Sequence, residues 1–171
     1  DDPELARYHI SATVTEEGWP SLSLEVGAKP RIMVGYSRSI DVTDVLPQEY
    51  FHSVKIGKKY STRQIPNEIR YTIRAQPFPL LRDEINIIER SGIETKIYLT
   101  GLYKSKKERV TVEWRVTVEG PEAVKRYADN FGFLEGSKAE KRYLLICRLY
   151  EEYKDKKLSK EDLDHINGQL A

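Results

Sequence analysis

The sequence contains one cysteine, one methionine and no uninterrupted apolar stretch of the roughly 18 residues that would cross a membrane. A single cysteine excludes an internal disulfide framework and a cysteine-rich zinc site. The N-terminus has no charged region followed by an apolar stretch, so no secretory signal is expected. We therefore expect an intracellular protein, either in the cytoplasm of a prokaryote or archaeon or in an organelle matrix. Neither a P-loop nor a dinucleotide fingerprint is present, so no nucleotide cofactor is expected.

The composition nevertheless indicates a folded protein. Aromatic residues make up 10% of the 171 residues, whereas disordered chains have few of them. The length suits one domain with an appended tail. We place a single domain at residues 1–157 and a helical tail at residues 158–171.

Charge is unevenly distributed, although the formal net charge is only +1. Residues 51–80 carry six Lys and Arg against one acid, and residues 96–115 carry six against two. The rest of the chain has a net charge of −8. Two basic segments in an acidic remainder are typical of a phosphate-binding protein, although a solvated face is the alternative.

Apolar periodicity predicts an α+β fold in the order helix, two strands, helix, two strands, helices. The last helix of the tail has a capping signal at Ser159 and Asp162. Trp19-Pro20 is expected to break the chain after the first helix, and residues 39–66 are expected to form an extended connection. The expected helices lie at 3–17, 80–91, 120–132 and 139–156, and the strands at 22–26, 31–34, 68–76, 96–104 and 110–118.

The strands predict an antiparallel sheet with one apolar face and one polar, basic face. Such a face suits the major groove of DNA, which admits a β-ribbon. We expect sequence to be read by Ser21, Ser23, Arg70, Thr72, Arg74, Lys96, Tyr98, Thr111, Arg115 and Thr117. We expect phosphate contacts mainly from Lys55, Lys58, Lys59, Lys104, Lys106 and Lys107.

Several segments, taken in this order, resemble the LAGLIDADG homing endonucleases over roughly residues 4–150. Residues 10–18 occupy the place of the signature helix, which is rich in small residues and ends in Glu17-Gly18. The αββαββα order of the elements agrees with that family. The other segments that carry the resemblance are 73–76, 114–118, 122–124 and 131–133, together with Lys138 before the long helix.

The resemblance implies a site-specific, double-strand DNA endonuclease that serves intron homing. Its fold is a sheet forming a DNA-binding saddle, with helices on the other face. A single signature helix implies a homodimer, which would join through Ser11, Ala12 and Thr15 and recognise a long pseudo-palindromic target. Glu17 would bind Mg²⁺, with Mn²⁺ or Ca²⁺ as other occupants. Gln76 would orient a water, and Lys138 would stabilise charge at the scissile phosphate.

Two alternatives stay open. Glu16 stands where the family usually has a small residue, which favours a protein that keeps the fold, binds DNA or RNA and no longer cleaves, as a regulator or maturase. The other alternative is an unrelated RNA-binding or protein-interaction domain. It predicts a monomer whose first helix packs against its own domain.

Overall fold

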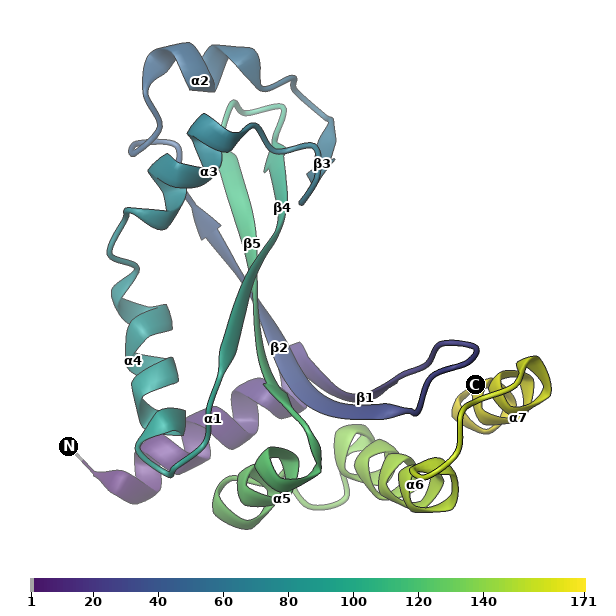
Figure 1. Ribbon diagram of the computed structural model, residues 1–171. Coiled ribbons are helices and arrows are strands. Elements are labelled where there is room, and N and C mark those ends of the chain that lie inside the picture. Colours follow the sequence, from purple (N-terminus) through teal and green to yellow (C-terminus); the bar gives the residue numbers. More distant parts are fainter. Residues whose placement is uncertain (1) are drawn as a thin grey trace. The chain divides into compact units, whose positions relative to one another are not determined.

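The computed structural model describes residues 2–171 and has an α+β architecture with one five-stranded antiparallel sheet (Figure 1). The expected α+β class with an antiparallel sheet is thereby confirmed. The strand order is β1-β2-β5-β4-β3. The elements, in chain order, are α1 (Pro3–Glu17), β1 (Gly18–Ser23), β2 (Arg31–Asp41), α2 (Gln48–Ser53), β3 (Lys59–Ser61), α3 (Asn67–Arg74), α4 (Pro79–Glu89), β4 (Lys96–Lys104), β5 (Val110–Glu119), α5 (Pro121–Asn130), α6 (Lys138–Tyr153) and α7 (Lys160–Leu170).

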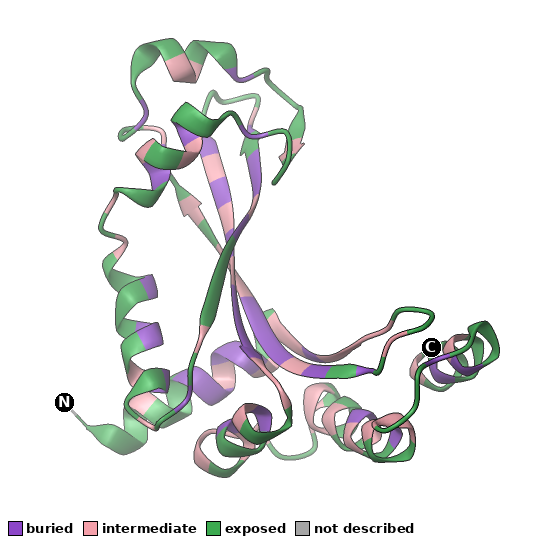
Figure 2. Ribbon diagram, in the orientation of Figure 1, coloured by how far each residue is buried: buried purple, intermediate pink, exposed green. Residues whose placement is uncertain are grey.

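The chain divides into two compact units. Unit 1 consists of the chain up to Tyr36, with Glu84–Lys96 and Thr117–Ala171. Unit 2 consists of Ser37–Asp83 and Ile97–Val116. The strands β2 and β5 continue from one unit into the other, and buried positions lie along both strands (Figure 2). None of the helices in residues 2–171 combines the length and apolarity needed to cross a membrane.

Helix α1 begins and ends as its sequence predicts. The side chain of Asp2 accepts a hydrogen bond from the Glu4 backbone N–H at 3.0 Å, and Pro3 is the first helical residue. Ile10 and Val14 are fully buried and attach the helix to unit 1. The helix ends at Glu17 because Gly18 adopts an extended conformation and begins β1 directly.

The C-terminal helix α7 is packed into unit 1. Leu149 of α6, Leu158 and Ile166 form one buried cluster, against which Leu22 and Leu24 of the β1–β2 hairpin pack. Two backbone hydrogen bonds join Leu158 to the turn between β1 and β2, from Gly27 N–H at 2.8 Å and to Ala28 O at 2.9 Å. The predicted capping box at Ser159 and Asp162 is confirmed.

The strand predicted over 68–76 is wrong, because residues 67–74 form the helix α3. Ile69 and Ile73 are buried, whereas Tyr71 between them is 71% exposed. Residues 69, 71 and 73 would share one face of a strand, so an exposed Tyr71 between two buried isoleucines fits a helix and not a strand. Arg70, Thr72 and Arg74 therefore lie on a helix.

Trp19-Pro20 does not break the chain, because both residues lie within β1. Pro20 pairs with Val34, and β1 is an edge strand, where the missing N–H of a proline is tolerated. The connection over 39–66 contains the end of β2, the short helix α2 and the three-residue strand β3. The predicted hairpin over 96–104 and 110–118 and the three helices after it are confirmed.

Candidate functional site

Two exposed carboxylates lie at the end of α1, where the helix passes directly into β1. Glu16 and Glu17 are both exposed, and Gly18 follows them. A Cβ atom at Gly18 would lie 2.3 Å from the carbonyl oxygen of Gly35 and 2.8 Å from that of Val14. Gly18 has a φ of −128°, which is extended, so a left-handed conformation is not the reason for a glycine here. The glycine is required by the close approach of β2, which fixes where the chain turns after Glu17.

The loop between α5 and α6 is hydrogen-bonded to the last turns of α1. The Thr15 hydroxyl accepts a hydrogen bond from Leu134 N–H at 3.1 Å, and the Ser11 hydroxyl donates to Gly132 O at 3.4 Å. This loop leads to Lys138, which is exposed at the first position of α6, after the N-cap Ser137. The last turns of α1 and the segment leading to Lys138 are therefore held together.

The residues expected at a dimer interface do not share one exposed surface. Ser11 is only 6% exposed, and Thr15 is occupied by Leu134 and by its own helix, where its hydroxyl donates to Ser11 O at 2.7 Å. Ala12 is half-buried. The exposed apolar side chains of α1 are Leu5 and Tyr8, at 66% and 60% exposure. With Ala12 they follow helical spacing and form a stripe, and neither Leu5 nor Tyr8 was among the predicted interface residues.

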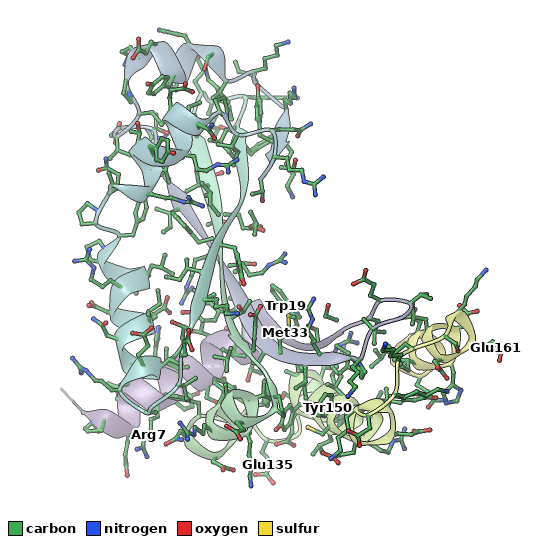
Figure 3. All side chains as sticks on the ribbon, viewed as in Figure 1. Arg7, Trp19, Met33, Glu135, Tyr150 and Glu161 are labelled. Atoms are coloured by element: carbon green, nitrogen blue, oxygen red, sulfur yellow. The ribbon has the colours of Figure 1, made fainter. Side chains whose placement is uncertain are left out.

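The β1–β2 hairpin of unit 1 places Ser21 and Ser23 on the face away from α6. Leu22 and Leu24 pack on the side of α6 and α7, so the alternating serines point the other way. Ser21 pairs with Met33, and Trp19 lies on the same face. Figure 3 shows Trp19 and Met33 on one side of this hairpin and Tyr150, from α6, on the other. Trp19 alternates with Ser21 and Ser23 along β1, and this spacing is the sequence signal that could have identified it. Met33 lies opposite Ser21 on β2.

Two other residues of unit 1 that were predicted to contact DNA bases are paired or buried. Lys96 forms a salt bridge with Glu119 at 2.8 Å. Thr117 is 2% exposed, so its expected exposure is wrong. The neighbouring Val116 and Val118 are buried as well, which shows that β5 is covered on both faces at this point. A strand covered on both faces leaves no side free for the alternating polar residue.

Unit 2 contains the other sheet residues that were predicted to read DNA. Thr111 and Arg115 are half-buried on β5, and Tyr98 of β4 is 42% exposed. Between them the Thr100 hydroxyl donates to the Glu113 carboxylate at 2.9 Å. This part of the polar face therefore includes an acid beside the hydroxyl, aromatic and basic groups.

The predicted residues near the end of α3 also belong to unit 2. Arg70 donates to the backbone carbonyls of Thr62 and Ile65, so its guanidinium holds the preceding loop. Arg74 is exposed. The Gln76 amide nitrogen donates to Thr72 O at 3.2 Å and closes the helix end. Gln76 thus lies in a different unit from Glu17 and Lys138.

The lysines expected to contact phosphates fall into two groups. Lys104 is 4% exposed, and its ammonium donates to Phe51 O at 3.0 Å and lies 3.7 Å from the centre of the Phe51 ring. The expectation that Lys104 faces solvent is therefore wrong. The remaining lysines of the group are exposed: Lys55, Lys58, Lys59, Lys106 and Lys107.

A single chain does not form a complete metal cage. No group of three or more His, Cys, Asp or Glu side chains in residues 2–171 is arranged to hold a metal ion. His9 lies 3.0 Å from the buried carboxylate of Glu84, and the rings of His52 and His165 contact Phe51 and Tyr153. The three histidines therefore have packing or pairing roles.

Comparison with known proteins adds no relative. No protein-family model, curated protein or solved structure matches this chain.

Proposed function

We propose that this protein is a homodimeric, metal-dependent, site-specific DNA endonuclease. The observation that carries the proposal is the junction between α1 and β1. There the exposed Glu17 is followed by a glycine that has no space for a side chain, and the loop leading to Lys138 is hydrogen-bonded to the same helix end. The resemblance of the sequence to the LAGLIDADG homing endonucleases assigns a carboxylate and a lysine to these positions.

The residues of the chain fit a hydrated Mg²⁺ ion that two copies would share. Mg²⁺ is commonly held by one or two carboxylates, several waters and substrate phosphates, and it does not need a cage made of protein alone. The exposed carboxylate of Glu17 is such a ligand. When bound, the ion supplies positive charge at the scissile phosphate and acidifies a bound water.

The protein groups then have distinct roles in phosphodiester hydrolysis. Glu17 holds the ion at the end of α1, and the ammonium of Lys138 stabilises negative charge that develops on the phosphate. Gln76 belongs to unit 2, and the water-orienting role that the resemblance implies for it stays a prediction; its amide nitrogen donates to Thr72 O. On the hairpin, Ser21 and Ser23 offer hydroxyl groups to base edges.

The second copy is proposed to dock on the exposed stripe of α1 formed by Leu5, Tyr8 and Ala12. A two-fold interface places the same surface of both chains in contact. Glu16 follows Ala12 by four residues on this side of the helix, and Glu17 is the last residue of α1. Two α1 helices that meet near these ends would bring acidic side chains together, where their repulsion favours a divalent cation. Ser11 and Thr15, which face their own chain, would position α1 for this contact.

The test begins with the DNA that the protein binds. Duplexes are selected from a random-sequence pool in EDTA, and the enriched sequence is placed in a plasmid. With Mg²⁺ the wild-type protein should linearise the plasmid, whereas Glu17→Gln should bind it with unchanged affinity and leave it intact. The matched variant Glu122→Gln, at an exposed position of α5, should cleave normally. Normal cleavage by Glu17→Gln would refute the site.

A second candidate is a DNA- or RNA-binding protein of the same fold that does not cleave. Glu16 favours it, because a second exposed acid beside Glu17 adds repulsion where a phosphate must approach. Sequence-specific binding by the wild-type protein without cleavage in Mg²⁺ or Mn²⁺ would select this candidate. The burial of Ile10, Ser11 and Val14 against unit 1 also agrees with a monomeric interaction domain, so the oligomeric state must be measured.

A further inference from the structure

The two units have opposite charge. Unit 2 contains 13 Lys and Arg against 7 Asp and Glu, a net charge of +6. The rest of the sequence contains 15 against 20, a net charge of −5. Each part contains charges of both signs, but the net charge is positive in unit 2 and negative in the remainder. The cationic character therefore belongs to one compact part of the chain.

Two segments of unit 2 bring exposed cations together. Gly57 donates its N–H to Lys104 O at 2.8 Å, and Ile56 forms an isolated bridge with Lys104. The strand β3 pairs with β4 next to this point, from Lys59 opposite Tyr103 to Ser61 opposite Gly101. The connection before α3 thus lies along the end of β4. We define the cationic patch as its exposed basic residues, Lys55, Lys58, Lys59 and Arg63, with Lys106 and Lys107 from the β4–β5 turn.

Two other cations of this region, Lys104 and Arg109, are bound within the protein and do not belong to the patch. Lys104 is bound to Phe51, and Arg109 pairs with Asp41 at 2.9 Å. Hydrogen bonds from Thr43 and Arg109 lower the pKa of Asp41, although burial acts in the opposite direction. Within residues 2–171, no patch residue forms a salt bridge.

Protection of a strand edge accounts for only part of the cationic patch. Lysine on a short edge strand discourages pairing with other chains, which accounts for Lys59 on β3. Lys106 and Lys107 lie in a turn, where there is no strand edge to protect. Like charges close together repel one another, and a polyanion relieves that repulsion. The side chain of Lys58 also lies 4.8 Å from the Tyr60 ring centre, which holds it near the surface.

We propose that the cationic patch binds the phosphate backbone of duplex DNA without reading its sequence. This inference rests on the proposed function for the choice of DNA as the partner. Phosphate contacts of this kind supply affinity and orientation but no base selectivity. Because the patch belongs to unit 2 and Glu17 to unit 1, binding through the patch is separable from cleavage by mutation.

The experiment measures binding of a labelled random-sequence DNA duplex, about 30 base pairs or three helical turns long. It is done in EDTA, at several salt concentrations between roughly 50 and 200 mM. The patch variant carries Lys58→Gln, Lys106→Gln and Lys107→Gln. The matched variant carries Lys125→Gln, Lys157→Gln and Lys160→Gln, all at exposed positions of unit 1. Both variants lower the net charge by the same amount.

We expect the patch variant to bind more weakly and to reduce the slope of log affinity against log salt by about one for each lysine removed. The matched variant should keep the wild-type slope. Equal losses in both variants would mean that only total charge matters, and unchanged binding in both would mean that the patch has no role; either result overturns the inference. A patch variant that loses affinity for duplex RNA but not for DNA overturns the choice of partner.

The proposed function can fail independently of this inference. Binding in EDTA does not depend on Glu17 or on metal. A wild-type protein that never cleaves a selected target, but whose patch variant shows the reduced salt slope, would refute the endonuclease and support the patch.

Discussion

The hydroxyl of Thr15 accepts a hydrogen bond from the backbone N–H of Leu134 at 3.1 Å, across 119 residues of sequence. The same hydroxyl donates to Ser11 O at 2.7 Å. Thr15→Val keeps the shape of the side chain and leaves the Leu134 N–H without this acceptor. We expect a loss of about 1–3 kcal/mol in the free energy of unfolding, measured by urea denaturation.

The matched change for Thr15 is Thr72→Val on α3. The Thr72 hydroxyl donates to Glu68 O within its own exposed helix, at 2.9 Å. Its loss should alter the free energy of unfolding by less than about 0.5 kcal/mol. Equal effects of the two substitutions would show that the link to Leu134 contributes nothing.

Gly18→Ala tests the close approach at the end of α1. The added Cβ would meet two backbone carbonyl oxygens, at 2.3 and 2.8 Å, and backbone cannot move aside as a side chain can. We expect a loss of about 3 kcal/mol or more. Gly168→Ala, within α7, places its Cβ in open space and should raise stability by roughly 0.5–1 kcal/mol. Thermal unfolding of both variants gives the comparison.

Lys104→Ala should destabilise the protein, although lysine is usually a surface residue. The substitution removes a buried stem, the hydrogen bond to Phe51 O and the contact with the Phe51 ring. We expect a loss of about 2 kcal/mol or more in denaturant unfolding. Lys106→Ala, two residues later and exposed, should change stability by less than about 0.5 kcal/mol. A larger loss of stability for Lys106→Ala than for Lys104→Ala would contradict the buried position of Lys104.

The capping box of α7 predicts a dependence of stability on pH. Backbone N–H donation from Ser159, followed by the ammonium of Lys156, lowers the pKa of Asp162 to about 2. An unfolded aspartate has a pKa of about 3.9, so the carboxylate stabilises the fold above that pH and loses this effect as the pH falls toward 2. Asp162→Asn should therefore be less stable than wild type at neutral pH, and the difference should shrink between pH 4 and pH 2.

Urea unfolding at several pH values measures the effect of Asp162. The control is Asp164→Asn, which removes the same charge from an exposed position of α7. Its difference from wild type should stay constant over this range. A constant difference for Asp162→Asn would exclude the proposed stabilisation.

The proposed dimer surface predicts a change in oligomeric state. Tyr8→Glu places a charge in the exposed stripe of α1 and should weaken self-association by about tenfold or more, which sedimentation velocity measures. Leu144→Glu makes a similar change on α6, where Leu144 is 61% exposed, and should leave association unchanged. A wild-type protein that sediments as a monomer at high concentration would refute the homodimer.

Short segments show why the sequence predicted most, but not all, of the fold. The strand β5 has five apolar residues in strict alternation, and helices α1 and α7 carry capping residues, so their assignments were secure. In α3, Ile69 and Ile73 fit both a strand and a helix, because positions four apart share a face in either. Tyr71 completes the alternation expected of a strand, and only its 71% exposure distinguishes the helix from a strand.

The candidate site was less predictable because side-chain environment depends on distant segments. Nothing near Lys104 in sequence indicates Phe51, 53 residues away, and nothing near Ser11 indicates Gly132. The position of Glu17 at the end of a helix followed local signals, namely the acid-Gly pair and the alternation after it. Roles in catalysis for Glu17, Gln76 and Lys138 stay predictions.

The hydrogen bonds between Leu158 and the β1–β2 turn impose an order on folding during synthesis. The turn at Gly27 and Ala28 is synthesised early, but Leu158, its hydrogen-bond partner, follows about 130 residues later. At roughly 5–20 residues per second, Leu158 is added roughly 6–26 s after the hairpin has been synthesised. All of unit 2, by contrast, has been synthesised once Val116 is added. The surface proposed to hold DNA by its phosphates is thus synthesised before the residue that fixes the β1–β2 hairpin, which carries Ser21 and Ser23.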